Sequence, residues 1–314
     1  MLKYTIKRSL QSIITLFIVV TVVFLLMRLL PEEGYFGDGF EKLDEMQKEA
    51  ILTNMGLRDP LPIQLLNFYG QLIRGDLGES TIYRRGVSVN EILKDKIPYS
   101  LWLGLSSVFL SMILGISSGL QMALHKNKLI DKIGTFYVVV VNAVPAAVYF
   151  LFIQLYMTRW FNLPILFDVD RPSSWFLPVI SMALGSIAHY AMWMRRYMVD
   201  ELNKDYLKLA RAKGMKNKDI MKKHVMRNAL VPLVQYFPAS ILFAIGGSLF
   251  IESLYSIPGM GGLLVDAIKI QDNPLVQALV LIFSTISIFG LLMGDLLMAL
   301  VDPRIKYGKD GGVR

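Results

Sequence analysis

Residues 205–232 have the sequence DYLKLARAKGMKNKDIMKKHVMRNALVP, which is basic, rich in helix-forming residues and enclosed by two long apolar segments. Gly214 and Pro232 are expected to divide it into a helix, a turn, a second helix and a return into apolar sequence. Basic loops between apolar segments stay on the cytoplasmic side of a membrane. The stretch is therefore predicted to be a cytoplasmic part of a membrane protein, shaped for a soluble partner to grip.

The apolar residues outside this stretch form runs that are long enough to cross a bilayer. The 314-residue chain is 54% hydrophobic with a mean hydropathy of +0.47, whereas soluble domains are about 45–50% apolar. A helix needs about 20 apolar residues to span a hydrocarbon core of about 30 Å. The chain is predicted to be an all-α, polytopic membrane protein with six transmembrane helices, at residues 9–30, 99–124, 134–158, 175–196, 231–254 and 276–301.

The first apolar run is expected to remain in the mature protein as a transmembrane helix. It extends from Ile13 to Leu30, which is longer than the roughly 7–15 residues of a signal-peptide core. Pro31 and Glu32 follow it in place of a small-residue cleavage site.

Lys and Arg predict the orientation. Of the 33 basic residues, 21 lie at the two termini, between the second and third spans, and in 195–230. Both termini are therefore predicted to lie on the cytoplasmic side of the membrane. The loop 31–98 carries twelve acidic and eight basic residues and is predicted to be external, with short helices at 41–56 and 62–74. The segment 255–275 is expected to form a re-entry loop or short helix on the same external face.

No residue pattern in the chain offers chemistry of its own. Cysteine is absent, and the three histidines, His125, His189 and His224, are widely spaced, so neither disulfides nor a metal site is expected. The sequence has no phosphate-binding glycine loop, nucleophile elbow or HExxH motif. The chain is predicted to be non-catalytic and to bind no cofactor. The net charge of +8 is explained by cytoplasmic retention rather than by nucleic acid.

Few polar residues lie at membrane depth. Asn142 falls in the third predicted span and His189 in the fourth. Hydrogen bonds between helices are the ordinary role of such residues, and lining a substrate path is the alternative. Ion-coupled carriers need ionisable groups at this depth, so their scarcity argues against a carrier of that kind.

Within 205–232, the first helix is expected to run from Val199 to Lys213 and the second from Asn217 to Met226. Small residues on the first helix allow another chain to approach the backbone closely, and Gly214 can adopt the left-handed conformation that ends a helix. The alternative is a basic loop held by anionic lipid head groups.

Several motifs, in order along the chain, resemble those of the permease subunits of bacterial oligopeptide, dipeptide and nickel ABC importers. They are MGLRDP (55–60), GDLGES (75–80), DYLKLARAKG (205–214), HVMRNALVP (224–232), ESLYSIPGMG (252–261) and DPR (302–304). One feature departs from the general importer pattern, in which the cytoplasmic loop begins Glu-Ala-Ala. Lys208, Leu209 and Ala210 stand there, so an ion pair from a glutamate at position 208 is not implied.

The resemblance implies a set of partners. A second homologous permease subunit would complete a translocation path for peptides, and two cytoplasmic ABC ATPase subunits would bind ATP and Mg. An extracellular substrate-binding lipoprotein would deliver the peptide, membrane lipid would surround the spans, and nucleic acid would have no role. Each permease would lay a coupling helix in a cleft of one ATPase.

The resemblance also implies roles for residues and segments. The ATPase-coupling residues would be Asp205, Tyr206, Ala210, Arg211, Ala212, Lys213, Gly214, His224, Asn228 and Pro232. The external rim would include Glu252, Pro258, Gly259 and Gly261, and the path would be lined by Asn142 and His189. The segments would be a cytoplasmic stub and first span (1–30), an external loop (31–98), a five-helix permease core (99–302) with its coupling loop (197–230), and a cytoplasmic tail (303–314).

Three alternatives stand beside the peptide permease. A nickel-importing permease shares the motifs, although no metal-ligand cluster lines the predicted spans. A stand-alone secondary carrier would need more ionisable groups at the membrane midplane. It would have no use for a cytoplasmic docking segment such as 205–232. A membrane-anchored scaffold or sensor would need a sizeable soluble domain, whereas the longest non-spanning stretch is 31–98.

Overall fold

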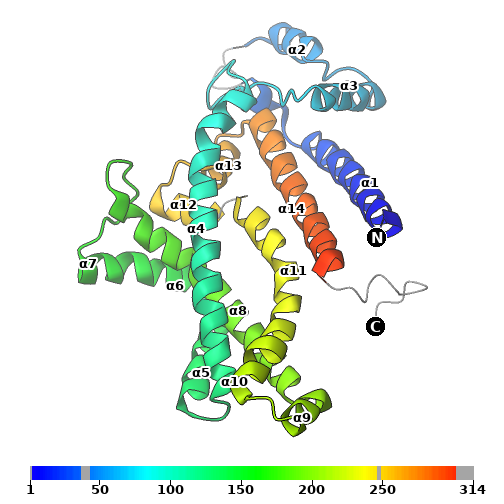
Figure 1. The fold of residues 1–314 in the computed structure, drawn as a ribbon. Helices are drawn as coiled ribbons and strands as arrows, with labels where there is room; N and C mark the ends of the chain where they lie inside the picture. The colour runs from blue at the N-terminus through cyan, green and yellow to red at the C-terminus, as the bar shows by residue number, and fades with distance from the viewer. Residues whose placement is uncertain (1, 37–42, 246–248, 302–314) are drawn as a thin grey trace.

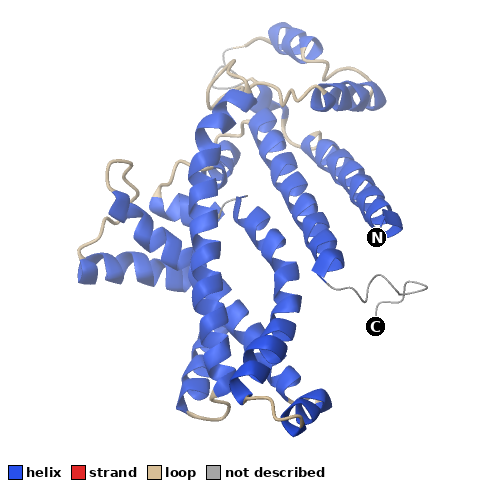
Figure 2. Ribbon diagram, in the orientation of Figure 1, coloured by secondary structure: helices blue, strands red, loops and turns tan. Residues whose placement is uncertain are grey.

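A computed structural model describes residues 2–36, 43–245 and 249–301 of the chain. These residues form helices joined by loops, and the one β-type pairing among them is an isolated bridge between Glu79 and Ser88 (Figure 2). The predicted all-α class is confirmed. The predicted tail 303–314 and the DPR motif lie outside the described residues.

Four helices of the described part are long and apolar enough to cross a membrane. They are α1 (Leu2–Met27), α4 (Val89–Leu124), α8 (Phe176–Leu202) and α14 (Asn273–Val301). They correspond to predicted spans one, two, four and six. The helix α4 begins ten residues before the predicted span 99–124, because Ser88 caps it by accepting a hydrogen bond from the amide of Asn90.

The third predicted span, 134–158, is not a single helix. The chain forms α5 (Leu129–Ala143), turns by 107°, and continues as α6 (Ala146–Phe152), a π-helical turn and α7 (Thr158–Phe161). Pro145 causes the break, since a proline forces the preceding residue out of the helical region and Val144 is extended at φ −89° and ψ 129°. Counted as one span, this bent pair gives up to five crossings among the described residues.

The fifth predicted span, 231–254, is also divided. It corresponds to α11 (Met226–Ile245) and α12 (Leu249–Tyr255). The helix α11 lies beside α14 and α4, and α1 packs on α14 (Figure 1).

Helices α4 and α8 pack along most of their length, and glycine brings them close. A Cβ atom at Gly115 of α4 would lie 2.6 Å from the Cβ of Tyr190 of α8. The hydroxyl of Ser111 donates to the carbonyl of Ala183 across the same contact, at 3.2 Å. The GxxxG pair Gly115 and Gly119 thus permits close helix packing.

The loop between α1 and α4 is ordered around two short helices, α2 (Glu45–Asn54) and α3 (Leu61–Ile73). Both agree with the segments predicted from apolar spacing. Asp44 begins α2 with a capping box that it shares with Gln47. The ring of Tyr69 in α3 stacks on Phe17 of α1, with centroids 5.1 Å apart. The predicted short helix in 255–275 is α13 (Met260–Lys269).

Candidate functional site

The candidate coupling element is the short helix α9 (Asp205–Ala212), at the end of the molecule where α5 begins (Figure 1). The prediction of one continuous helix from Val199 to Lys213 is wrong for its first half. The helix α8 continues to Leu202, the chain turns at Asn203, and α9 starts afresh. Asn203 and Lys204 thus set α9 off from the long axis of α8.

One face of α9 is anchored to the chain itself. Leu207 and Ala210 are buried in a cluster with Met194 and Met198 of α8 and Ile220 beyond the turn. The small side chain of Ala210, 7% exposed, therefore serves packing within the subunit. Ala210 thus faces the subunit itself, whereas Ala212 and Gly214 are exposed; a role of these residues in contacting an ATPase stays a prediction.

Gly214 ends α9 in the left-handed conformation, at φ +77°. The amide of Gly214 donates to the carbonyl of Arg211 at 2.9 Å, and the amide of Met215 donates to the carbonyl of Ala210 at 3.2 Å. This pair of bonds is the Schellman motif. A Cβ atom on Gly214 would meet nothing within 4 Å, so backbone conformation, not crowding within the subunit, requires glycine here.

The two predicted coupling motifs meet at Glu201, near the end of α8. The Tyr206 hydroxyl donates to the Glu201 carboxylate, and the Asn228 side-chain amide donates to the same carboxylate oxygen at 2.8 Å. Asn228 also donates to the Tyr206 hydroxyl at 3.1 Å. The His224 ring lies 6.2 Å from the Tyr206 ring, edge to face. We call Glu201, Tyr206 and Asn228 the α8–α11 clamp.

Burial, and then the hydrogen bond to Glu201, raise the pKa of Tyr206 to about 12. The hydroxyl therefore stays protonated and able to donate throughout the physiological range. Sequence reasoning did not single out Glu201. The one signal for it is a carboxylate at the end of an apolar run whose flanking sequence is strongly basic.

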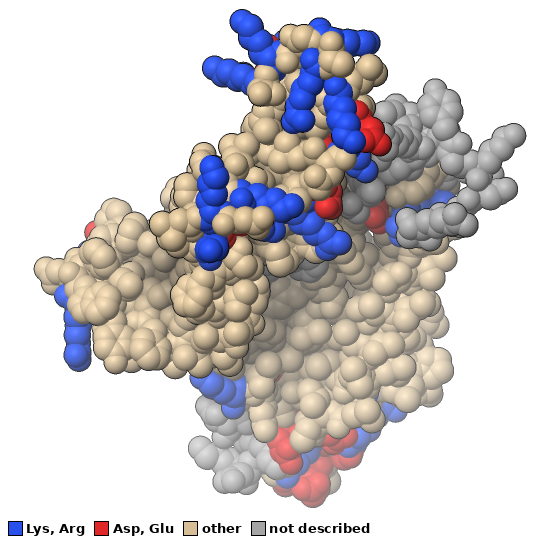
Figure 3. All heavy atoms as spheres, turned by 90° about the horizontal axis from the view of Figure 1, so that it is seen from below, with Lys and Arg blue, Asp and Glu red and all other residues tan. Residues whose placement is uncertain are grey.

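The outward surface of α9 is basic with an apolar centre. Leu209 is 58% exposed, and Asp205 is exposed and forms an ion pair with Lys208, at 2.8 Å. Figure 3, seen from this end, shows Lys and Arg gathered over it. The exposed basic residues between α8 and the start of α11 are Lys204, Lys208, Arg211, Lys213, Lys216, Lys218, Lys222, Lys223 and Arg227.

The second predicted helix, Asn217 to Met226, is present but does not end at Met226. It comprises α10 (Asn217–Asp219) and a π-helical turn, Ile220–Val225, that continues directly into α11. Pro232 lies inside α11 and is not a boundary. His224 lies in the π-helical turn, a feature that often marks functional positions in helices.

Away from the coupling element, Glu252 of α12 is fully buried. Its carboxylate accepts hydrogen bonds from the Ser100 hydroxyl of α4 at 2.8 Å and from the Gly261 amide, in the first turn of α13, at 2.7 Å. A Cβ atom on Gly259 would collide with Glu252 and Ser100. The motif ESLYSIPGMG thus joins α12, α13 and α4, and Glu252 and Gly259 lie beneath the surface that the sequence assigns to a rim.

Asp272 ties the GDLGES segment to the start of α14. Its carboxylate accepts from the Ser80 hydroxyl at 2.5 Å and from the amides of Ile82 and Tyr83 at 3.0 and 2.9 Å. Burial of the carboxyl opposes its ionisation, but the hydrogen bonds from Ser80 and these amides outweigh it and hold the pKa of Asp272 below its usual range. Sequence analysis did not identify this contact, because 192 residues separate its partners.

The two predicted path-lining residues are both exposed in the single subunit. Asn142 lies in the last turn of α5, beside the break, and His189 lies against the rings of Trp193 and Tyr236, at 6.2 and 6.0 Å. Neither side chain makes a hydrogen bond within the described part of the chain, so the hydrogen-bonding role expected for them is not seen there. No group of three or more potential metal ligands occurs among the described residues.

Two family models together match almost the whole chain. Residues 111–307 match the binding-protein-dependent transport system inner membrane component, and residues 1–103 match the N-terminal region of the same class of membrane component. The first match covers the coupling element, and the boundary between the two falls within α4.

Curated relatives match over their full length. The dipeptide transport system permease protein DppB of Lactococcus lactis is 32% identical over 98% of this chain and 100% of the relative. The glutathione permease GsiC of Pectobacterium atrosepticum is 35% identical, with the same coverage. The oligopeptide permease AppB of Bacillus subtilis is 32% identical, also with the same coverage.

Solved structures show the same fold at low identity. The crystal structure of an amino acid ABC transporter with histidines has a chain that aligns with a TM-score of 0.52 at 17% identity, covering 68% of this chain and 94% of that one. The MetNI methionine ABC transporter, in an inward-facing conformation, gives a TM-score of 0.51 at 14% identity, covering 67% and 96%. On its apolar helices, its fold and these matches, the chain belongs to the family of binding-protein-dependent transport system inner membrane components.

Proposed function

We propose that the chain is a non-catalytic permease subunit of an ATP-driven peptide importer, and that it forms half of the translocation path beside a second, homologous permease. Full-length similarity to dipeptide, oligopeptide and glutathione permeases supports the substrate class. The observation that carries the mechanism is the α8–α11 clamp, in which Tyr206 of α9 and Asn228 of α11 both bind Glu201 of α8.

In this proposal α9 is the coupling helix, and its outward surface seats in a cleft of one of two cytoplasmic ABC ATPases. Leu209 and Ala212 supply apolar contact, and Arg211, Lys213 and the neighbouring basic residues supply positive charge. Leu207 and Ala210 hold α9 to the subunit. ATP and Mg bind to the ATPases, and closure of those subunits moves α9.

The clamp explains how such a movement reaches the membrane. A displacement of α9 acts on Tyr206, which is hydrogen-bonded to Glu201 at the end of α8 and to Asn228 in the first turn of α11. Because α8 packs along α4 and α11 lies beside α4 and α14, both helices carry the displacement into the bundle. The path would then alternate between its two openings, with Asn142 and His189 as candidates for its lining.

The same proposal assigns the remaining partners and the orientation. An extracellular substrate-binding lipoprotein delivers the peptide at the α13 end, and both termini lie in the cytoplasm. A nickel substrate is the weaker alternative, since no cluster of metal ligands occurs among the described residues.

Reconstitution tests the function directly. Proteoliposomes would hold the two permeases and two ATPases, with the binding protein added outside. Uptake of a labelled oligopeptide is expected to require internal ATP and to stop when the binding protein is omitted. ATP-dependent uptake of nickel, without uptake of any di- to pentapeptide, would contradict the proposal.

A further inference from the structure

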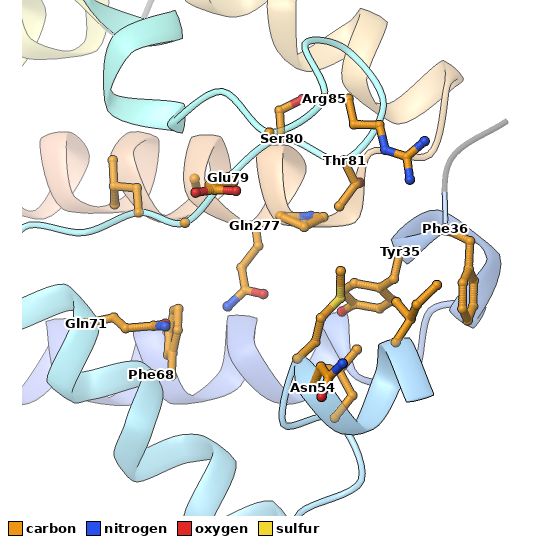
Figure 4. Close-up of a pocket in the computed structure, with 18 of the residues that line it drawn as sticks. Tyr35, Phe36, Asn54, Phe68, Gln71, Glu79, Ser80, Thr81, Arg85 and Gln277 are labelled. Atoms are coloured by element: carbon orange, nitrogen blue, oxygen red, sulfur yellow. The ribbon is translucent and has the colours of Figure 1, made fainter. Parts of the chain in front are cut away.

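A cavity of about 560 Å³ lies at the end of the molecule remote from α9. The segment containing α2 and α3, the loop 77–86 and the first turns of α14 enclose it (Figure 4). Its volume falls within the range of small-ligand sites. It is separate from the coupling element.

The two sides of the cavity differ in chemistry. Arg85 and Tyr35 lie at one side, and Phe68 of α3 lies at the other (Figure 4). Leu72 of α3 and Leu281 of α14 also line it. One side is therefore cationic and polar, whereas the walls contributed by α3 and α14 include aliphatic and aromatic groups.

Arg28, the second cation that lines the cavity, is held in a fixed orientation. Its Nε donates to the side chain of Gln64 at 2.7 Å, and its Nη1 donates to the Tyr35 hydroxyl at 2.9 Å. Within the described part of the chain, neither Arg28 nor Arg85 forms an ion pair with a carboxylate. Among the described residues, two guanidinium groups thus line one cavity with a single acidic residue, Glu79. Guanidinium forks suit phosphate and carboxylate oxygens.

The wall that α3 contributes to the cavity packs on the last turns of α1. Phe68, which lines the cavity, lies against Phe24 with ring centroids 5.2 Å apart, and the neighbouring Tyr69 stacks on Phe17. Phe24 precedes Met27, the last residue of α1, by three positions, which corresponds to about 4.5 Å along a helix. The helix α3 contains no charged residue. It therefore lies alongside the apolar span of α1, where the surrounding medium is lipid.

We propose that this cavity binds a glycerophospholipid from the leaflet remote from α9. The phosphodiester faces Arg28 and Arg85, and one acyl chain lies along Phe68, Leu72 and Leu281. A lipid fits better than a soluble anion because the cationic side and the apolar walls belong to one cavity, and the α3 wall packs on the apolar helix α1. The lipid would fasten the α2–α3 segment to α14.

Native mass spectrometry of the full-length chain in detergent micelles tests the site. Separate samples receive phosphatidylglycerol, diacylglycerol or inorganic phosphate. One molecule of phosphatidylglycerol is expected to remain bound, with retention of the other two at least tenfold lower. Equal retention of diacylglycerol would show that the phosphodiester contributes nothing to binding, and would contradict its proposed contact with Arg28 and Arg85. Displacement of phosphatidylglycerol by an equal concentration of inorganic phosphate would identify a site for a free anion and overturn the lipid.

Matched variants separate the site from the general lipid surface. Arg28→Gln is expected to weaken retention roughly tenfold, since it removes a charged donor, whereas Arg74→Gln, just after α3, is expected to leave it unchanged. Leu72→Trp fills the acyl groove without touching a cation and should also weaken retention. Its control is Leu66→Trp, on the same helix at a residue 72% exposed and outside the cavity. If Leu72→Trp and Arg28→Gln both retain the lipid as the wild type does, the site does not exist.

Discussion

The side-chain amide of Asn228, in the first turn of α11, donates a 2.8 Å hydrogen bond to the carboxylate of Glu201, near the end of α8. Along the chain, the two helices are connected by a 23-residue segment, 203–225, that contains α9 and the π-helical turn. The contact closes this segment at its base, and Tyr206 joins it from α9. In the proposed mechanism, force applied to α9 is therefore delivered to α8 and α11 at once.

Glu201→Gln is expected to uncouple the subunit while leaving its fold intact. The amide keeps the size of the carboxylate but loses the charge that strengthens both hydrogen bonds. ATP hydrolysis that depends on the loaded binding protein should fall severalfold in proteoliposomes. The control is Lys208→Ala, which removes an exposed i,i+3 ion pair with Asp205 and should change little. Wild-type hydrolysis by Glu201→Gln would show that the clamp does not transmit movement.

Gly259→Ala is expected to destabilise the protein. A methyl group there would overlap the Glu252 carboxylate and the Ser100 hydroxyl, and displacing a buried carboxylate from its donors costs about 1–3 kcal/mol or more. The thermal unfolding midpoint in detergent should drop. Gly70→Ala is the matched control, because a Cβ atom at Gly70 in α3 meets nothing within 4 Å, and alanine should be neutral or slightly stabilising there.

Asp272 predicts a loss of stability in acid. Its folded-state pKa lies below the ordinary value, so its contribution is fully present above pH 4–5 and is lost as the pH falls through the folded pKa. At pH 7, Asp272→Asn should melt at a lower temperature than the wild type. The difference between the two melting temperatures should shrink toward pH 3. Asp266→Asn, at an exposed site of α13, is the control for loss of one surface carboxylate. A pH-independent difference for Asp272→Asn would mean that the carboxylate is not the stabilising species.

Cysteine labelling tests the orientation, and the natural absence of cysteine makes the background clean. Lys216 and Glu45 are both exposed. Glu45 begins α2, and Lys216 lies between α9 and α10, at the opposite end of the molecule (Figure 1). Lys216→Cys should be protected from an impermeant thiol reagent in intact cells, and Glu45→Cys should react. The reverse pattern would overturn the proposed topology.

The sequence predicted the elements whose signals are local. Apolar spacing located α2, α3 and the four long helices, and Gly214 was correctly expected to adopt a positive φ. The bend at Val144 is also local, because Pro145 imposes it. An apolar run of sufficient length nevertheless suggested one span there, since hydropathy alone does not register a break in the backbone.

The contacts that organise the site depend on tertiary structure. Glu201 and Asn228 are 27 positions apart, and no pattern within a helix pairs them. Ala210 was assigned to a partner because it is small, but which face of α9 turns inward depends on the direction set at Asn203. The same limit applies to Glu252, whose burial follows from the packing of α12 and α13 on α4.

Gly214→Val tests the coupling role of α9 most directly, measured as ATP hydrolysis stimulated by the loaded binding protein. Valine at φ +77° costs roughly 1–3 kcal/mol and adds bulk to the exposed end of α9. Gly75→Val imposes comparable strain, at φ +73° with open space around it, at the far end of the molecule. Lys216→Ala removes one of many exposed charges. The subunit should insert in all three variants, and only Gly214→Val should lose stimulation sharply. Normal stimulation by Gly214→Val together with its loss in Lys216→Ala would contradict the steric coupling proposed for α9.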